Sequence, residues 1–201
     1  MKRRLILLCA ALGLLLTSAA FAQQQATLSG IVKTEGDVAE GARVAVHIVD
    51  RDNVWQREVA SAVPVGGTFS VTTQAVEAGE LVPFRSGSML FPGLQNEYSV
   101  EPADVNYARA LVNVYVDQNG NSVFDNITVD GNYIGVASLE APIGFFSLIY
   151  VDKAATVTGK GAVLELVPGW NVFTVRFPEG EDPSYSVAPL VDDIVMDVFL
   201  P

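Results

Sequence analysis

The chain has 201 residues, half of them apolar, with 23 acidic residues against 12 basic ones and a formal net charge of -11. Such a surface repels phosphate backbones, so nucleic-acid binding is disfavoured. The apolar half is large enough to bury a core, and the charge favours solubility outside the cytoplasm.

The first 22 residues have the features of a secretory signal peptide. Residues 2–4 are basic, residues 5–16 are apolar, and residues 20–22, Ala-Phe-Ala, fit the A-x-A cleavage pattern. We therefore predict that the mature chain begins at Gln23 and is secreted or extracytoplasmic, in the periplasm or at the cell surface. No stretch reaches the ~20 apolar residues that span a bilayer, so a membrane span is not expected.

Removal of this signal peptide also removes Cys9, the single cysteine of the chain. The mature protein then has no thiol to act as nucleophile, metal ligand or disulfide partner. Without residues 2–4, nine basic residues remain against 23 acidic ones, which gives a formal charge of -14. Stability must therefore come from the packing of apolar side chains.

Short β-branched runs separated by Gly, Asp, Asn or Pro follow one another along the mature chain, and this punctuation predicts β-strands. In the first half the predicted strands are residues 27–33, 42–49, 54–63 and 68–73. In the second half they are residues 108–116, 133–139, 145–151, 162–167, 170–177 and 193–200. No window after the signal peptide shows a sustained helical period. We predict an all-β protein built from antiparallel β-sandwiches of transthyretin-like or immunoglobulin-like type.

A segment with weak periodicity, residues 76–101, interrupts the series of strands and carries prolines and several glycines. It predicts a small transthyretin-like domain over residues 23–80, a linker or long loop over 81–96, and a second β-sandwich domain over 97–201. One sandwich with a long insertion is the alternative.

The N-terminal half resembles the carboxypeptidase regulatory-like domain, a transthyretin-like β-sandwich of secreted bacterial proteins. The resemblance lies in SGIVKTEGDVAEGARVAV and REVASAVPVGGTFSV, through Gly30, Val32, Gly36, Gly41, Ala42, Val44, Val46, Gly67, Phe69 and Val71. The later VPGWNVFTV, residues 167–175, is similar to another segment of that family. The resemblance implies a non-catalytic spacer, folding aid or binding module, and it carries no catalytic residue to this chain.

The stretch VYVDQNGNSVFDN, residues 114–126, is a candidate Ca²⁺ site. Side-chain or backbone oxygens at positions 1, 3, 5, 7 and 9 of a loop suit a hard cation, and here those positions are Asp117, Asn119, Asn121, Val123 and Asp125. Position 12 is Thr128 rather than a bidentate Glu, and position 6 is Ser122 rather than Gly. The alternative is a β-hairpin with a tight turn at Asn119 and Gly120.

His47 is the single histidine and lies within a predicted strand, so it cannot build a zinc or copper site alone. We expect it to be a surface or cross-strand residue. The motifs of serine hydrolases, zinc proteases and phosphate-binding loops are missing from the sequence. A pair of carboxylates is the remaining enzymatic route, and acid-rich stretches supply Glu179, Glu181, Asp182, Asp192 and Asp193. We interpret these acids as a solvated surface and expect no enzyme.

Aromatic residues offer a further interpretation. A carbohydrate-binding module could stack sugars on Trp55, Tyr98, Tyr107, Tyr133, Trp170 and Tyr185, although core packing is the more common use of such side chains. Our main prediction is an exported, non-catalytic β-sandwich protein of the cell envelope with a structural, adhesive or protein-interaction role. Its partner would be an envelope protein or, in the alternative, a glycan. A carboxylate-based hydrolase is the least favoured alternative.

Overall fold

The computed structural model describes residues 25–33, 40–50, 54–85, 98–117, 119–124, 134–139 and 143–199. These residues form fourteen β-strands and one short 3-10 helix, η1 (Ala78–Glu80). The strands are β1 (Thr27–Lys33), β2 (Ala42–Val49), β3 (Trp55–Ala62), β4 (Thr68–Thr72), β5 (Val82–Pro83), β6 (Tyr98–Glu101), β7 (Asn106–Val116), β8 (Ile134–Leu139), β9 (Gly144–Val151), β10 (Ala155–Gly159), β11 (Ala162–Leu166), β12 (Gly169–Arg176), β13 (Ser184–Ala188) and β14 (Leu190–Phe199). No helix in these ranges is long and apolar enough to cross a membrane.

The all-β prediction is confirmed. All ten predicted strands are present, β1 and β2 with the predicted bounds and the others with ends that differ by at most three residues. β5, β6, β10 and β13 were not predicted. The strands form an eleven-stranded sheet and a three-stranded sheet of order β11-β10-β6, packed as a sandwich-like arrangement. The assignment to a transthyretin-like or immunoglobulin-like fold stays a prediction.

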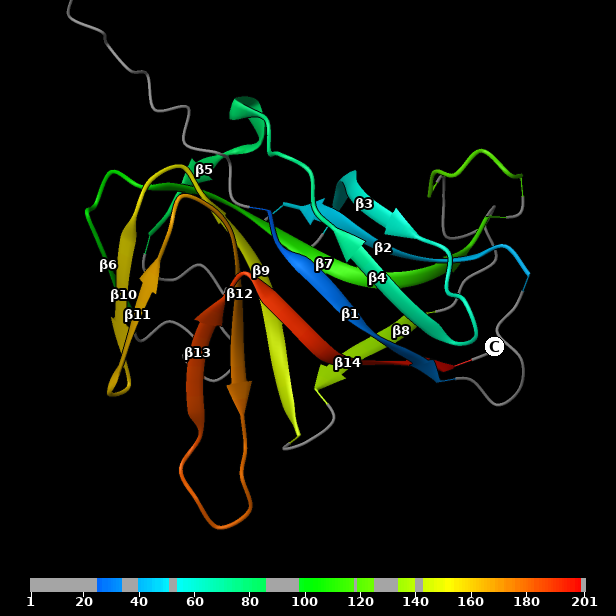
Figure 1. The fold of residues 1–201 in the computed structure, drawn as a ribbon. Helices are drawn as coiled ribbons and strands as arrows, with labels where there is room; N and C mark the ends of the chain where they lie inside the picture. Colours follow the sequence, from blue (N-terminus) through cyan, green and yellow to red (C-terminus); the bar gives the residue numbers. More distant parts are fainter. Residues whose placement is uncertain are drawn as a thin grey trace, which may run out of the picture.

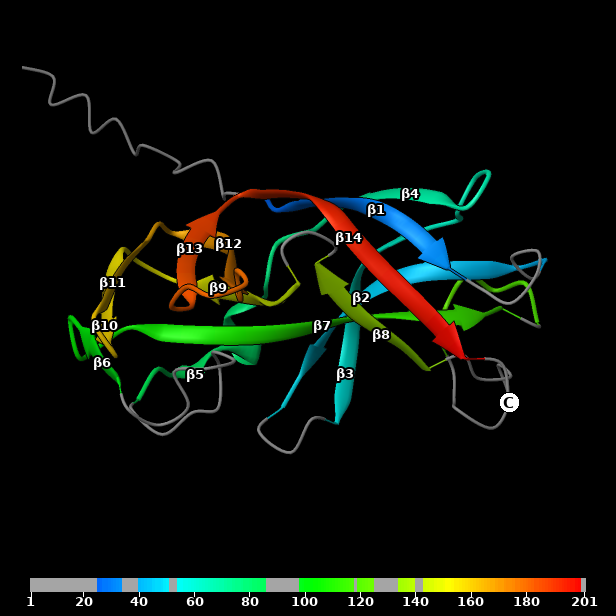
Figure 2. The ribbon, with the colours of Figure 1, turned by 90° about the horizontal axis from the view of Figure 1, so that it is seen from below.

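The first hydrophobic core lies inside the large sheet, which curls so that β1, β4 and β14 lie across from β2, β3 and β7 (Figures 1 and 2). Its largest side chains include Leu28, Phe69, Leu148, Trp170 and Met196. The Trp170 indole Nε1 donates to the Gln74 carbonyl oxygen at 2.6 Å, which satisfies the one polar atom of the largest core residue. This core therefore joins strands from both ends of the chain.

The second core lies between the three-stranded sheet and the strands β9 and β12. Its members include Tyr98 of β6, Val157 of β10, Leu164 of β11 and Phe173 of β12. Figure 1 shows the three-stranded sheet on the left, the strands of the first core on the right, and β9 and β12 between them. β7 contributes to both cores, and in Figure 2 it runs along the whole length of the molecule.

β12 and residues 148–151 of β9 form a wall that is covered on both faces. Side chains alternate along a strand, so Trp170 and Val172 point into the first core while Phe173 and Val175 point into the second. The two strands pair along their full length, from Gly169 with Val151 to Arg176 with Gly144. Strands buried on both faces carry apolar side chains at successive positions, as residues 148–151 of β9 and Val172 and Phe173 of β12 do.

The predicted boundary at residues 81–96 falls between strands that share one sheet. β1 pairs with β14, and β2 pairs with β7. Residues 86–97 lie outside the described part of the chain, as do the predicted signal peptide residues 1–22. The division into 23–80 and 97–201 stays a prediction, and it must accommodate hydrogen bonds between strands on both sides of the linker.

The parallel pairing of β1 with β14 depends on a glycine. The other strand pairs of the described residues are antiparallel, whereas β1 and β14 run in the same direction with a register shift between Leu28 and Gly30. A Cβ atom at Gly30 would overlap the backbone carbonyl of Ile194, so a side chain there would push β1 away from β14. Gly30 is one of the residues that carry the family resemblance, and close backbone approach is its physical role here.

We expect Gly30→Ala to lower the free energy of unfolding by about 1 to 3 kcal/mol, because the added methyl group overpacks the β1–β14 contact. Urea denaturation followed by tryptophan fluorescence would measure the change. Gly79→Ala is the matched control, since nothing lies within 4 Å of a Cβ at that position. Equal stability of the two variants would contradict the close approach of β1 to β14.

Candidate functional site

A buried polar cluster lies on the side of β2 and β7 that faces away from the first core. The β2 residues on either side of His47 point into that core, so His47 points to the opposite side. β7 contributes Asn113 and Tyr115 to the same side, and β3 contributes Glu58. His47, Asn113 and Tyr115 are 4%, 6% and 1% exposed. Three neighbouring strands therefore share one buried polar contact.

Hydrogen bonds connect the members of this cluster. His47 Nδ1 lies 2.9 Å from Asn113 Oδ1, and His47 Nε2 lies 3.5 Å from Glu58 Oε2. The Tyr115 hydroxyl donates to the same Glu58 oxygen at 3.2 Å. The Phe124 ring covers the cluster, with centroids 5.6 Å from the His47 ring and 5.4 Å from the Tyr115 ring.

The orientation of the Asn113 amide determines the tautomer of His47. Asn113 Nδ2 is buried and has no hydrogen-bond partner in the described part of the chain, while its Oδ1 accepts from His47 Nδ1. If the amide is reversed, Nδ2 donates to Nδ1, and a neutral His47 carries its proton on Nε2, toward the Glu58 carboxylate. In the orientation that the structure has, Oδ1 accepts from Nδ1–H, whereas the reversed amide would pair the buried donor and leave Oδ1 in the unpartnered position.

Burial controls the protonation of this cluster. Loss of hydration lowers the pKa of His47, and the hydrogen bond to Asn113 and the charge of Glu58 oppose that effect only in part. Burial also raises the pKa of Tyr115, and the nearby Glu58 carboxylate adds to this. His47 is therefore neutral at neutral pH, which suits a histidine that connects strands in a closed site.

The prediction of a surface or cross-strand His47 is half confirmed. The cross-strand contact to Asn113 is present, but the surface position is wrong because Phe124 and Tyr115 pack over the imidazole. The alternation of β2 indicates which side His47 faces. The alternation does not show that this side is covered by residues far along the chain, such as Asn113, which lies 66 positions after His47.

The loop that follows β7 turns its side-chain oxygens toward its own backbone. Asp117 Oδ1 and Oδ2 accept from the N–H groups of Asn121 and Ser122 at 3.1 and 2.7 Å. Asn119 Oδ1 accepts from Asn121 at 3.0 Å, and Asn121 Oδ1 accepts from the N–H of Val123 at 2.9 Å. Ser122 has a φ of 62°, in the left-handed region, where a Ca²⁺ loop of this spacing has glycine.

The structure brings together three of the five predicted Ca²⁺ ligands. Asp117, Asn119 and Asn121 share a network of backbone contacts, Val123 is exposed in the same loop, and Asp125 lies outside the described residues. Among the described residues no group of three or more His, Cys, Asp and Glu side chains is placed to hold a metal ion. The hairpin alternative stays a prediction, because residues 125–133, which would supply its second strand, lie outside the described residues. The calcium site stays a prediction.

The aromatic residues considered for sugar stacking do not share one exposed face. Trp170 is buried in the first core, and Tyr98 and Tyr107 are buried in the second. Tyr185 is half-buried and stacks on Phe173 with ring centroids 6.1 Å apart. Core packing therefore removes Trp170, Tyr98 and Tyr107 from the proposed sugar-stacking set. Tyr133 and the Trp55 side chain lie outside the described part of the chain.

The acidic residues considered for catalysis lie at the surface. Glu179, Glu181 and Asp182 are exposed in the turn between β12 and β13, and Asp192 is exposed in β14. Asp193 accepts from Arg176 Nη2 at 2.6 Å, which links β14 to β12. The solvated interpretation fits the exposed four, and an ion pair explains Asp193.

A scan against protein-family models, a search of curated proteins and a search of solved structures each give no match to this chain. The resemblance of the N-terminal half to the carboxypeptidase regulatory-like domain therefore stays a prediction.

We expect the stability of the protein to fall as the pH drops below about 6.5, because His47 binds a proton in the unfolded chain and resists it in the fold. The slope for one such group is at most about 1.4 kcal/mol per pH unit, and His47→Gln should remove this contribution. Urea denaturation between pH 7.5 and 5 would compare the two proteins.

The single histidine also permits a direct measurement, since its imidazole Hε1 gives one proton NMR signal to titrate. A midpoint at or above 6.5 would contradict the buried neutral state.

If the loop binds Ca²⁺ with an extracellular-type affinity, about 10 mM CaCl₂ should raise the melting temperature by about 4 °C or more. Asp117→Asn keeps an oxygen for the Asn121 N–H but loses a carboxylate, so it should reduce this rise. MgCl₂ at the same concentration controls for ionic strength. An unchanged melting temperature, with no heat of binding in calorimetry, removes the calcium prediction.

Proposed function

We propose that this chain is an exported, non-catalytic β-sandwich protein of the cell envelope with a structural, adhesive or protein-interaction role. The export rests on the basic, apolar and small-residue pattern of residues 1–22. The absence of cysteine after Cys9 is compatible with folding by packing alone in any redox environment. The interaction role rests on a feature of the folded surface.

An apolar strip is exposed where β9 begins and β12 ends, and this single observation carries the interaction role. It consists of Ile143, Phe145 and Phe177, which are 69%, 43% and 41% exposed. The two phenyl rings contact each other edge to face with centroids 6.0 Å apart. Contiguous exposed apolar side chains on a soluble protein mark contact surfaces more often than isolated ones do.

The strip is held by a rigid part of the fold. The Phe177 N–H donates to the Ile143 carbonyl oxygen at 2.9 Å, which extends the pairing of β12 with β9. The neighbouring Arg176 and Asp193 form an ion pair with 24% and 34% exposed side chains. A preformed surface loses little conformational freedom when it binds, so these contacts favour a binding role for the strip.

The proposal predicts that the full chain, expressed in its own cells, is recovered from the extracytoplasmic fraction with Gln23 at its N-terminus. N-terminal sequencing and cell fractionation would test this. The purified mature protein should also sediment with isolated envelopes, and the double variant Phe145→Ser, Phe177→Ser should weaken that association about tenfold or more.

The matched control is Val63→Ser, Val65→Ser, which removes two exposed apolar side chains far from the strip along the chain. A cytoplasmic protein that keeps residues 1–22 would refute the export. Equal envelope association of both double variants would refute the role of the strip.

A further inference from the structure

β13 has one edge with no paired strand among the described residues, next to the apolar strip, and β11 lies close to β13. Among the described strands β13 pairs with β12 and with no other. Its sequence, SYSVA, contains no charge, its prolines lie only at the flanking positions Pro183 and Pro189, and its pairing with β12 shows no register shift. Natural proteins protect most edges with charges, prolines or bulges. β3 follows that rule, because its edge carries Arg57 and Glu58 and its pairing with β2 has two register shifts.

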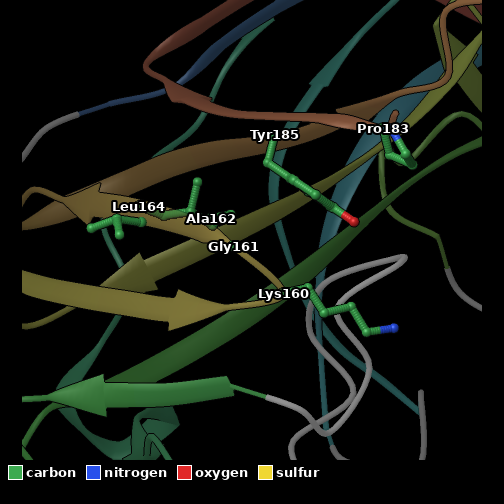
Figure 3. A pocket seen from close by; sticks show the side chains of 7 residues that line it. Lys160, Gly161, Ala162, Leu164, Pro183 and Tyr185 are labelled. Carbon is green, nitrogen blue, oxygen red and sulfur yellow. The ribbon is translucent and has the colours of Figure 1, made fainter. Parts of the chain in front are cut away.

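A cleft of about 280 Å³ lies beside this edge, between β13 and the β10–β11 hairpin. Its lining includes Lys160, Ala162 and Leu164 of the hairpin, with Pro183 and Tyr185 on the other side. Figure 3 shows the Tyr185 side chain extending from β13 into the space beside the β10–β11 hairpin. Because Tyr185 stacks on Phe173, this wall of the cleft is formed before any ligand arrives.

The cleft and the apolar strip lie on the same side of the sheet. Residues directly opposite each other in a sheet point to the same face, and Val175 lies opposite both Phe145 and Tyr185. Val187 of β13 packs on the second core on this face as well. A strand added to β13 would place every second side chain on this face, about 7 Å apart, toward the cleft.

Charge indicates the kind of strand that fits. The turn before β13 exposes Glu179, Glu181 and Asp182, and Asp192 is exposed shortly after it, whereas Lys160 is the single basic residue of the cleft lining. The chain as a whole has a net charge of -11. Antiparallel pairing of two copies through β13 would bring these acids near one another, which disfavours a second copy, whereas a basic segment is attracted.

We propose that the β13 edge and the adjoining cleft bind an extended, basic segment of a partner protein by β-strand addition. Backbone hydrogen bonds to β13 supply affinity, and alternate side chains of the segment enter the cleft beside Tyr185. This inference rests on the proposed interaction role and names the chemistry of the partner.

The test uses a fluorescein-labelled peptide of nine residues, Lys-Val-Thr-Val-Thr-Val-Thr-Val-Lys, and the mature protein at low salt. Fluorescence anisotropy should show saturable binding. Glutamate in place of both lysines, or proline in place of the central threonine, should weaken binding about tenfold or more through charge and through the lost N–H.

Two protein variants locate the site. Asp182→Lys should weaken binding about fivefold at low salt, whereas Glu40→Lys, an equal charge change at an exposed residue before β2, should change it less than about twofold. Tyr185→Ala should weaken binding about tenfold, and Tyr185→Phe, which keeps the ring and the fold, should bind like the wild type.

No binding of the lysine peptide, or equal binding by Tyr185→Ala, would overturn the inference. A concentration-dependent dimer in sedimentation equilibrium that Ser184→Lys abolishes would also overturn it, because the occupant would then be a second copy. If envelope association survives in Asp182→Lys and Tyr185→Ala, the strand-addition site fails while the proposed function stands. If only the double variant Phe145→Ser, Phe177→Ser loses envelope association, the strand-addition site likewise fails while the proposed function stands.

Discussion

The structure depends on the burial of β12 and of residues 148–151 of β9 on both faces. Each strand carries large apolar side chains at successive positions, so Trp170 serves one core and Phe173 serves the other. A register slip of one residue would exchange the two faces and misplace every side chain of the wall. Each core therefore constrains the other, and the N-terminal strands β1 to β4 are joined to the C-terminal strands through the same sheet.

Much of this fold could be predicted from local sequence, and the exceptions have physical reasons. β1 and β2 are bracketed by turn residues and were predicted with their observed bounds, whereas β6, β10 and β13 are short and alternate apolar residues with Ser or Thr. Their strand character depends on neighbours that the local sequence does not contain. The same limit explains why the burial of His47 was not predicted. The strand pattern shows which way its side chain points, and only residues distant in the sequence make it buried.

The loop after β7 shows why metal sites are difficult to infer from spacing. The positions that favour a cation, Asp117, Asn119 and Asn121, also suit a loop in which side-chain oxygens accept backbone N–H groups. Ser122 counts against calcium by its residue type, yet its backbone adopts the left-handed conformation that glycine supplies in such loops. The sequence spacing of these residues predicted that their side-chain oxygens lie close together in one loop. It could not show whether those oxygens bind a cation or accept hydrogen bonds from the backbone N–H groups of the loop.

An uncharged strand edge on a strongly acidic protein has a specific consequence. An exposed edge invites any extended chain, and copies of the same protein are the most abundant candidates wherever the protein is concentrated. With a net charge of -11, two copies repel each other before their edges meet, and acids near both ends of β13 strengthen that repulsion locally. The same charges attract a basic segment. On β13 the surrounding acidic charge therefore disfavours pairing between copies, as charged residues and register shifts do on β3. Because this effect acts between solvent-exposed charges, it weakens as the ionic strength rises.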